Sequence, residues 1–235
     1  MARLPSLAAA AGLAALHLLS VRLRAPGAPR AAWLSAAGGV AVAYVFVDIL
    51  PGLAEQQAAW IAARPNRPLE WLAEQIYFAA LAGLVLSYGL LRATSHVERR
   101  FALRIGGFAV YNALVGYLTA RMRGASLAIW FLALGAHFVV SDTALRRDYP
   151  EHFQRRGRWV LAAAVLLGWG AHQLGEVAPP VVAAITGLLG GSILLDTLKE
   201  EVPSEREGRF LPFLAGTAGY SLLYLVLLYF VYTDR

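Results

Sequence analysis

The sequence lacks cysteine entirely and contains few charged residues. Without cysteine, the chain has no disulfides, no thiolate metal sites and no cysteine nucleophile. Asp, Glu, Lys and Arg make up 15% of the 235 residues, whereas soluble domains carry roughly a quarter. Apolar residues take their place and reach 58% of the chain. This composition predicts an integral membrane protein.

The apolar residues are grouped in long continuous runs. A hydrocarbon core of about 30 Å requires roughly 20 apolar residues for each helical span. The runs do not alternate as the strands of a membrane β-barrel do. No internal sequence repeat is evident among them. We therefore predict a single all-α transmembrane domain over residues 1–235, with eight transmembrane helices at about 4–23, 31–53, 71–91, 101–120, 125–145, 159–174, 180–198 and 210–232.

The net charge of +6 comes from short loops rich in Lys and Arg, which orient a membrane protein in its bilayer. We therefore expect the lipid bilayer, and no nucleic acid, as a partner. Arg22, Arg24 and Arg30 outnumber Arg3 across the first span, which favours a retained span over a cleaved signal peptide. Counted after the first, third, fifth and seventh spans together, Lys and Arg number 15, against 6 on the opposite side. The more basic side is predicted to be cytoplasmic, with both termini outside a plasma or inner membrane.

Several polar side chains interrupt the predicted spans. A charge at the bilayer centre costs between about 2.5 and 17 kcal/mol, so such residues usually face a cavity or a partner. Asp48 lies near the end of the second span, and Pro51 is expected to break the helix there and free carbonyls for cation binding. An interfacial Asp at a helix end is the alternative. Tyr111 and Asn112 lie mid-span, where an amide oxygen suits a hard cation or a helix–helix hydrogen bond.

Two histidines lie near carboxylates within the spans. His137 and Ser141 are four residues apart and share a helix face, whereas Asp142 points about 140° away from His137. Such a cluster suits a metal ion or a proton relay, with a packed core histidine as the alternative. His172 and Glu176 are also four residues apart and form a plausible half-site for a divalent metal, unless Glu176 lies at the membrane surface.

The other polar residues of the spans receive simpler interpretations. Asp196 lies near the cytoplasmic end of the seventh span and is expected at the interface beside Lys199. His17 has no polar neighbour in its span, so a structural role is expected. Neither a G-x-S-x-G nor an H-E-x-x-H motif is present, and we expect no enzyme. An intramembrane enzyme would depend on scattered His, Asp and Glu residues alone.

Four motifs in this sequence resemble those of the ZIP family of divalent-metal transporters. The segments AYVFVDILPG, YNALVG, HFVVSD and GGSILLDTLKEEVP look like motifs in the second, fourth, fifth and seventh spans of that family, in the same order. The match covers most of the chain from the second span on. The resemblance implies a ZIP-like bundle of eight spans with both termini outside, in agreement with the charge distribution, and it suggests a homodimer.

The family's binuclear metal site uses ligands from the fourth and fifth spans, with help from the sixth. Most of these positions differ here, since Tyr111, Val115 and Phe138 replace a His and two acidic residues. Asn112 and His137 keep ligand types. A tight site needs about three or four protein ligands, so other residues would have to contribute. The predicted metal ligands are Asn112, His137, Asp142, His172 and Glu176, and the residues predicted to line the pathway or support the ligands are Asp48, Tyr111, Ser141 and Asp196.

The sequence thus predicts a ZIP-like membrane transporter of a divalent metal cation or another small solute. Zn, Mn or Fe would be the transported metal, and no tightly bound cofactor is expected. The replaced ligand positions favour an alternative, which is a non-transporting protein of the same fold that binds a partner or a lipid.

Overall fold

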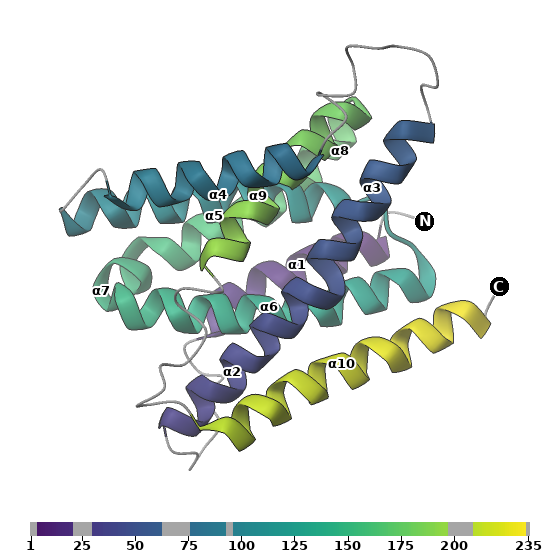
Figure 1. Cartoon of the computed structure of the whole chain (residues 1–235). Coiled ribbons are helices and arrows are strands. Elements are labelled where there is room, and N and C mark those ends of the chain that lie inside the picture. Colours follow the sequence, from purple (N-terminus) through teal and green to yellow (C-terminus); the bar gives the residue numbers. More distant parts are fainter. Residues whose placement is uncertain (1–3, 21–29, 63–75, 93–95, 197–208, 234–235) are drawn as a thin grey trace.

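The part of the chain that the structure describes is helical. The computed structural model describes residues 4–20, 30–62, 76–92, 96–196 and 209–233. Within these ranges the chain forms helices joined by short turns, and no strand occurs, as Figure 1 shows. The predicted all-α fold class is confirmed for these residues.

Each predicted span coincides with one helix or one continuous helical stretch. The second span is longer than predicted, because three segments follow one another from Arg30 to Ala62. Residues 21–23, 71–75 and 197–198 of the predicted spans lie outside the described part. The segments are α1 (Leu4–Leu19), α2 (Arg30–Tyr44), η2 (Val45–Ile49), α3 (Leu50–Ala62), α4 (Ile76–Arg92), α5 (Val97–Thr119), α6 (Gly124–Asp148), α7 (Pro150–His152), η3 (Phe153–Gly157), α8 (Arg158–Leu174), α9 (Pro179–Asp196) and α10 (Phe210–Thr233).

Pro51 does not break the helix that carries Asp48, so this prediction was wrong. Proline has no backbone N–H, and its ring clashes with the carbonyl four residues earlier. The chain accommodates it with a π-helical turn over Val45–Ile49, in which the Leu50 N–H donates to the Val45 carbonyl oxygen. Such turns occur within α-helices and are frequent at functional sites. The helix continues as α3, and Asp48 lies inside the π turn.

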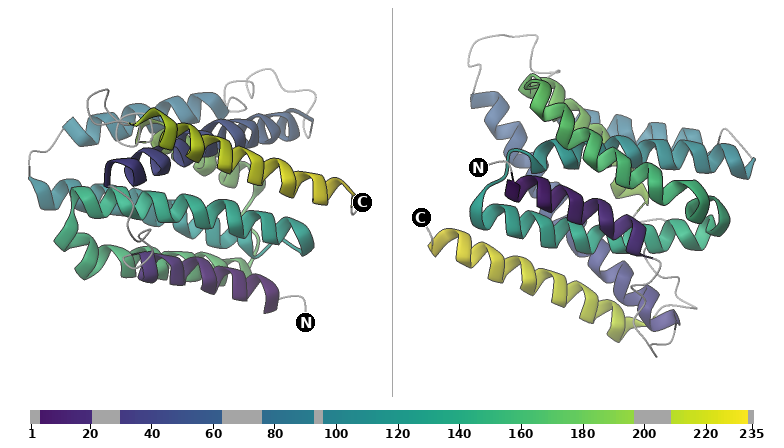
Figure 2. Two further views of the ribbon diagram at one scale, coloured as in Figure 1. Left: turned by 90° about the horizontal axis from the view of Figure 1, so that it is seen from below. Right: turned by 180° about the vertical axis from the view of Figure 1, so that it is seen from behind.

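The helices pack in two sets. In the first set, α5 packs on α8, and α1 packs on both α6 and α8. In the second set, α4 packs on α9, and the stretch from α2 to α3 packs on α10 and α9. Contacts of α2 and α10 with α6, and of α4 and α9 with α5, join the two sets. The arrangement can be followed from three sides in Figures 1 and 2.

The packed pairs follow a two-fold pattern. If α1 is exchanged with α8, α2 with α9, α4 with α10, and α5 with α6, the main packed pairs are unchanged. The α4–α9 pair then corresponds to α10–α2, and α5–α8 corresponds to α6–α1. The first three helical stretches of the chain thus correspond to the last three, and α5 and α6 lie between them in the sequence. The sequence itself shows no repeat.

Glycines bring the paired helices into close contact. In three pairs, a Cβ added to a glycine of either helix would overlap a backbone carbonyl oxygen of the other helix. The α1–α6 pair has the same reciprocal arrangement against the side chains of Phe131 and Leu16. Small residues of this kind allow helices to approach closely. The glycine pairs are Gly116 and Gly168 in α5–α8, Gly83 and Gly191 in α4–α9, Gly39 and Gly216 in α2–α10, and Gly12 and Gly135 in α1–α6.

The two ends of the bundle differ in charge. The start of α1 and the end of α10 lie at the same end (Figures 1 and 2). The end of α4, the start of α5 and the turn at α7 lie at the opposite end (Figure 1). Most of the described arginines belong to the segments that meet at this opposite end, namely Arg92, Arg99, Arg100, Arg104, Arg146, Arg147, Arg155, Arg156 and Arg158.

The outward surface of the bundle is rich in apolar side chains. By length and composition, three described helices can cross a membrane: Ala31–Glu55, Val97–Thr119 and Phe210–Tyr229. Shorter apolar helices cover Leu4–Leu19, Ile76–Gly89 and Val181–Leu195. The helix Phe210–Tyr229 in α10 is the clearest candidate for contact with lipid, because only 6% of its apolar stretch is buried against the rest of the described chain.

We expect Gly168→Ala to destabilise the fold. The added methyl group would overlap the carbonyl oxygen of Ala113, and moving α8 away from α5 should cost about 1–3 kcal/mol, as overpacking typically does. Thermal unfolding in detergent should therefore give a lower melting temperature. Gly170→Ala is the matched control in the same helix, since a Cβ there meets nothing within 4 Å. Equal melting temperatures of the two variants would contradict this close packing.

A candidate functional site at the centre of the bundle

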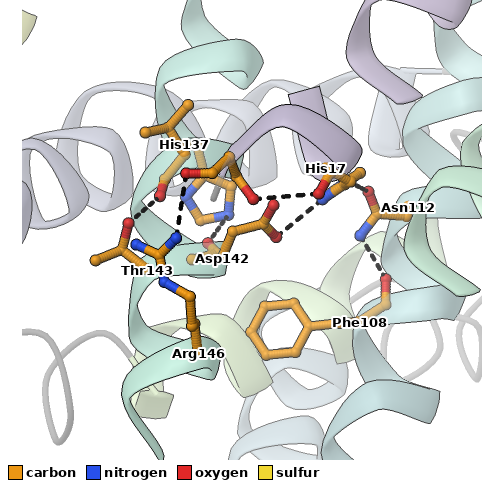
Figure 3. Close-up of polar contacts among 10 residues, drawn as sticks. His17, Phe108, Asn112, His137, Asp142, Thr143 and Arg146 are labelled. Atoms are coloured by element: carbon orange, nitrogen blue, oxygen red, sulfur yellow. Dashed lines mark hydrogen bonds and ion pairs between the residues drawn. The ribbon is translucent and has the colours of Figure 1, made fainter. Parts of the chain in front are cut away.

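A buried histidine joins three helices of the first set. His17 in α1 lies 2.9 Å from Asp142 in α6, between Nδ1 and Oδ1, and 2.7 Å from Asn112 in α5, between Nε2 and Oδ1. Figure 3 shows the imidazole between these two side chains. All three residues are 1% exposed, and the ring of Phe138 lies 4.4 Å from that of His17. In such dry surroundings hydrogen bonds are strong, and unpaired polar groups are costly.

Asn112 is oriented by its own helix. Its Nδ2 donates to the carbonyl oxygen of Phe108, one turn earlier in α5, at 2.8 Å (Figure 3). A carbonyl oxygen accepts hydrogen bonds and cannot donate them. The amide nitrogen of Asn112 must therefore face Phe108, and its amide oxygen must face His17.

Polar contacts continue from this site toward the basic end of the bundle. The Ser20 hydroxyl donates to the carbonyl oxygen of His17 at 3.1 Å. The Arg146 guanidinium donates to the carbonyl oxygen of Ser20 at 3.4 Å. Arg146 follows Asp142 by about one turn of α6, so a cation lies on the same side of the helix as the buried carboxyl group.

A layer of aromatic side chains links the site to the second helix set. The ring of His137 in α6 stacks on Tyr44 in α2, with 4.2 Å between centroids and an interplanar angle of 24°. The hydroxyl groups of Tyr44 and Tyr111 are 2.5 Å apart and share a hydrogen bond. His137 Nε2 lies 3.2 Å from the Ser141 hydroxyl. Its Nδ1 has no hydrogen-bond partner among the described residues.

Asp48 extends these contacts to α10. The hydroxyl of Tyr220 in α10 donates to Oδ2 of Asp48 in the π turn. The ring of Tyr220 also meets Tyr44 edge-on, with 6.3 Å between centroids. A continuous series of polar and aromatic contacts therefore runs from α10 through α2 to α5 and α6.

A cavity of about 230 Å³ opens beside Tyr111. It is bounded by α4 and α9 of the second set and by α5 of the first set. Phe108, whose carbonyl group orients Asn112, also lines it. At its margin, Arg104 pairs with Asp148 at 3.0 Å. The cavity thus lies between the two helix sets and reaches residues that hold the central site.

The structure places two of the predicted metal ligands at the central site. Asn112 and Asp142 both hydrogen-bond to His17, and His137 lies nearby but stacks on Tyr44. No three His, Cys, Asp or Glu side chains in the described part are arranged to hold a metal ion. The predicted five-residue metal site is therefore not assembled in this structure.

The other two predicted ligands lie farther along the bundle. His172 packs edge-on against Tyr117, with 4.9 Å between ring centroids, and Tyr117 follows Asn112 by more than one turn of α5. Glu176 is exposed in the turn after α8. The Tyr117 hydroxyl accepts a hydrogen bond from the neighbouring Val177 backbone N–H at 2.7 Å. These residues are associated with the end of α8 and not with His17.

Three of the four predicted pathway residues belong to the central contacts. Asp48 bonds to Tyr220, Tyr111 lines the cavity, and Ser141 contacts His137. Asp196 is the last residue of α9, and its side chain lies outside the described part of the structure.

The central position of His17 was not predicted, because a structural role was expected from the lack of polar neighbours within its span. Its partners lie 95 and 125 residues away along the chain. One signal was available in the sequence, since a lone ionisable residue within an apolar span usually has a partner on another helix.

Comparisons with known proteins add no family to these observations. No protein-family model matches the chain, and no curated protein matches it. Any assignment of function therefore depends on the helices and side chains described above.

Replacement of His17 by leucine should destabilise the protein, because Asp142 and Asn112 would remain buried without this partner. The loss should be about 1–2 kcal/mol, the upper range for hydrogen bonds between membrane helices. Asp142→Leu should have a similar effect. The double variant should cost less than the sum of the single variants, since neither group is then left facing an apolar partner.

Equilibrium unfolding in mixed micelles would measure this coupling between His17 and Asp142. His172→Leu with Asp142→Leu is the control pair, because His172 packs against Tyr117 instead. Strictly additive effects for His17 and Asp142 would refute their direct interaction.

Proposed function

We propose that this chain is an integral membrane protein with a ZIP-like arrangement of eight spans, and that it transports a small solute. Divalent cations such as Zn, Mn and Fe are among the candidate solutes. The observation that supports transport most strongly is the location of the buried polar contacts. They extend across the junction of the two helix sets, and the cavity between the sets reaches them.

The exposed apolar surface supports a location in the bilayer. Phe210, Leu211 and Leu222 of α10 are 73%, 74% and 63% exposed. Soluble monomers rarely expose apolar patches larger than a few hundred Å². Lipid chains would cover these side chains, and the close glycine contacts would hold the helices together where lipid removes the hydrophobic driving force for helix association.

The charge asymmetry supports one orientation. The arginine-rich end of the bundle would face the cytoplasm by the positive-inside rule. Both termini would then lie outside, on the same side of the membrane, as an even number of spans requires. A plasma or bacterial inner membrane fits this orientation.

The two-fold pattern of helix contacts is consistent with a transporter. Many transporters are built from two repeats of opposite topology, with the substrate site near the membrane midplane where the repeats meet. An odd number of spans in each repeat would give the two repeats opposite topology. Movement of one helix set against the other would open the cavity beside Tyr111 to alternate sides.

A second candidate function is favoured by the hydrogen bonds of His17. They occupy Asn112 and Asp142 and cross-link α1, α5 and α6. A protein fixed in this way would keep the fold without transport and would act by binding a partner or a lipid.

Transport should be blocked by filling the cavity. Gly107 lines it, and a Cβ added there meets nothing within 4 Å, so Gly107→Phe should occupy the space without displacing backbone. We expect saturable flux in proteoliposomes for at least one of Zn, Mn, Fe, Co or protons, reduced about tenfold or more in Gly107→Phe. A barrier of about 1.4 kcal/mol is enough for a tenfold reduction.

Gly106→Phe is the matched control, because Gly106 is also free of contacts but does not line the cavity. It should retain the wild-type flux. Absence of flux above empty liposomes for the whole panel would refute the transport proposal and favour the second candidate.

A further inference from the structure

The hydrogen bonds around His17 determine where its protons lie. Nδ2 of Asn112 donates to the carbonyl oxygen of Phe108, so Oδ1 of Asn112 must be the atom that meets His17. An amide oxygen is an acceptor. The hydrogen in the 2.7 Å contact therefore belongs to Nε2 of His17.

The second contact of the imidazole needs another hydrogen. His17 Nδ1 and Asp142 Oδ1 are 2.9 Å apart. Either Nδ1–H donates to a carboxylate, or a protonated carboxyl group donates to a neutral ring. Without a hydrogen between them, two lone pairs would face each other in a site where both residues are 1% exposed. Both allowed arrangements are neutral overall and contain the same number of protons.

We propose that His17 and Asp142 form a proton-binding site in the folded chain. The pair holds one proton more than a neutral imidazole and a carboxylate would hold separately. Asn112 is the positioning residue. Its amide oxygen accepts the hydrogen of His17 Nε2, so the shared proton lies between Nδ1 and Asp142.

Other ionisable groups surround the pair without replacing its contacts. From α6, His137 and Arg146 lie on either side of Asp142 along the chain. From α5, Tyr111 bonds to Tyr44 of the second set, and Asp48 in η2 bonds to Tyr220 in α10. The ionisable residues of α8, Arg158 and His172, are near its two ends. Both ring nitrogens of His17 are already occupied by Asn112 and Asp142.

A route to the site is suggested by the cavity. Phe108 lines the cavity and orients Asn112, and Asn112 contacts the imidazole. If the chain transports a solute as proposed, this pair is the site at which a coupled proton binds and leaves. That role rests on the proposed function, whereas the proton-binding site itself does not.

The Asp142→Asn variant tests the shared proton independently of the hydrogen bonds around His17, because it removes the carboxyl group and retains a hydrogen-bonding side chain. The new amide can donate to Nδ1 of a neutral His17, whose Nε2–H still donates to Asn112. The variant keeps both hydrogen bonds of His17 but takes up no proton on folding above about pH 6.5, where a histidine in the unfolded chain is neutral, whereas the wild type takes up one. The wild type therefore loses stability relative to Asp142→Asn as pH rises, because its folded state binds more protons than its unfolded state.

The test is equilibrium unfolding in mixed micelles between pH 5 and 8. The ratio of the wild-type folding constant to that of Asp142→Asn should fall about tenfold for each pH unit. Asp148→Asn is the control, since Asp148 pairs with Arg104 and Arg147 away from His17, and its curve should remain parallel to that of the wild type. Parallel curves for the wild type and Asp142→Asn would overturn the proposal.

A second variant covers the case in which Asp142→Asn does not fold. Asp142→Leu removes the carboxyl group and leaves a neutral His17 bonded to Asn112, so the wild type should lose stability with rising pH relative to it above about pH 6.5. Parallel curves in this window would also overturn the proposal. The measurement involves no transport, so a negative flux experiment and a missing proton site give distinguishable results.

Discussion

A single imidazole in apolar surroundings determines how α1, α5 and α6 fit together. His17 has two ring nitrogens at a fixed angle, and each meets a polar group from a different helix. The cost of leaving any of these groups unpaired in a dry interior is high. Only a narrow range of rotations of α1 about its axis satisfies both contacts. The directional hydrogen bonds of His17 therefore fix the orientation of α1, in addition to its apolar packing.

The remaining helix pairs depend on shape more than on polarity. Apolar contact alone specifies little where the surroundings are equally apolar. Reciprocal glycines provide the missing specificity, because each pair can come close at one register along the two helices. The polar site then lies within an arrangement held by close backbone contact.

The fold could be predicted from the sequence to a large extent, because long apolar runs correspond directly to helices. The runs that became α5, α6 and α10 agree with the structure within a few residues. The effect of Pro51 could not be predicted from the sequence, since it depends on whether the backbone can add a π turn. The two-fold pattern was missed because it resides in which helices pack together, and the residues at equivalent positions differ.

The candidate site could be predicted in part. Asn112, Asp142 and Tyr111 were recognised because each is polar within an apolar span. Their partners could not be assigned, since hydrogen bonds between spans depend on rotations that the sequence does not state. His17 has no polar neighbours along its span, and the residues that surround it in space come from two other helices.

The π turn before Pro51 has a mechanical consequence. One additional residue in a helix turns everything after it by about 100°, so the faces that α2 and α3 present to their neighbours differ. α2 lies against α10, and α3 lies against α9. The continuous helical stretch from α2 to α3 therefore packs on α10 through its N-terminal half and on α9 through its C-terminal half. A tilt of α10 would therefore be transmitted through the α2–α3 stretch to α9, and the helices of the second set would move together.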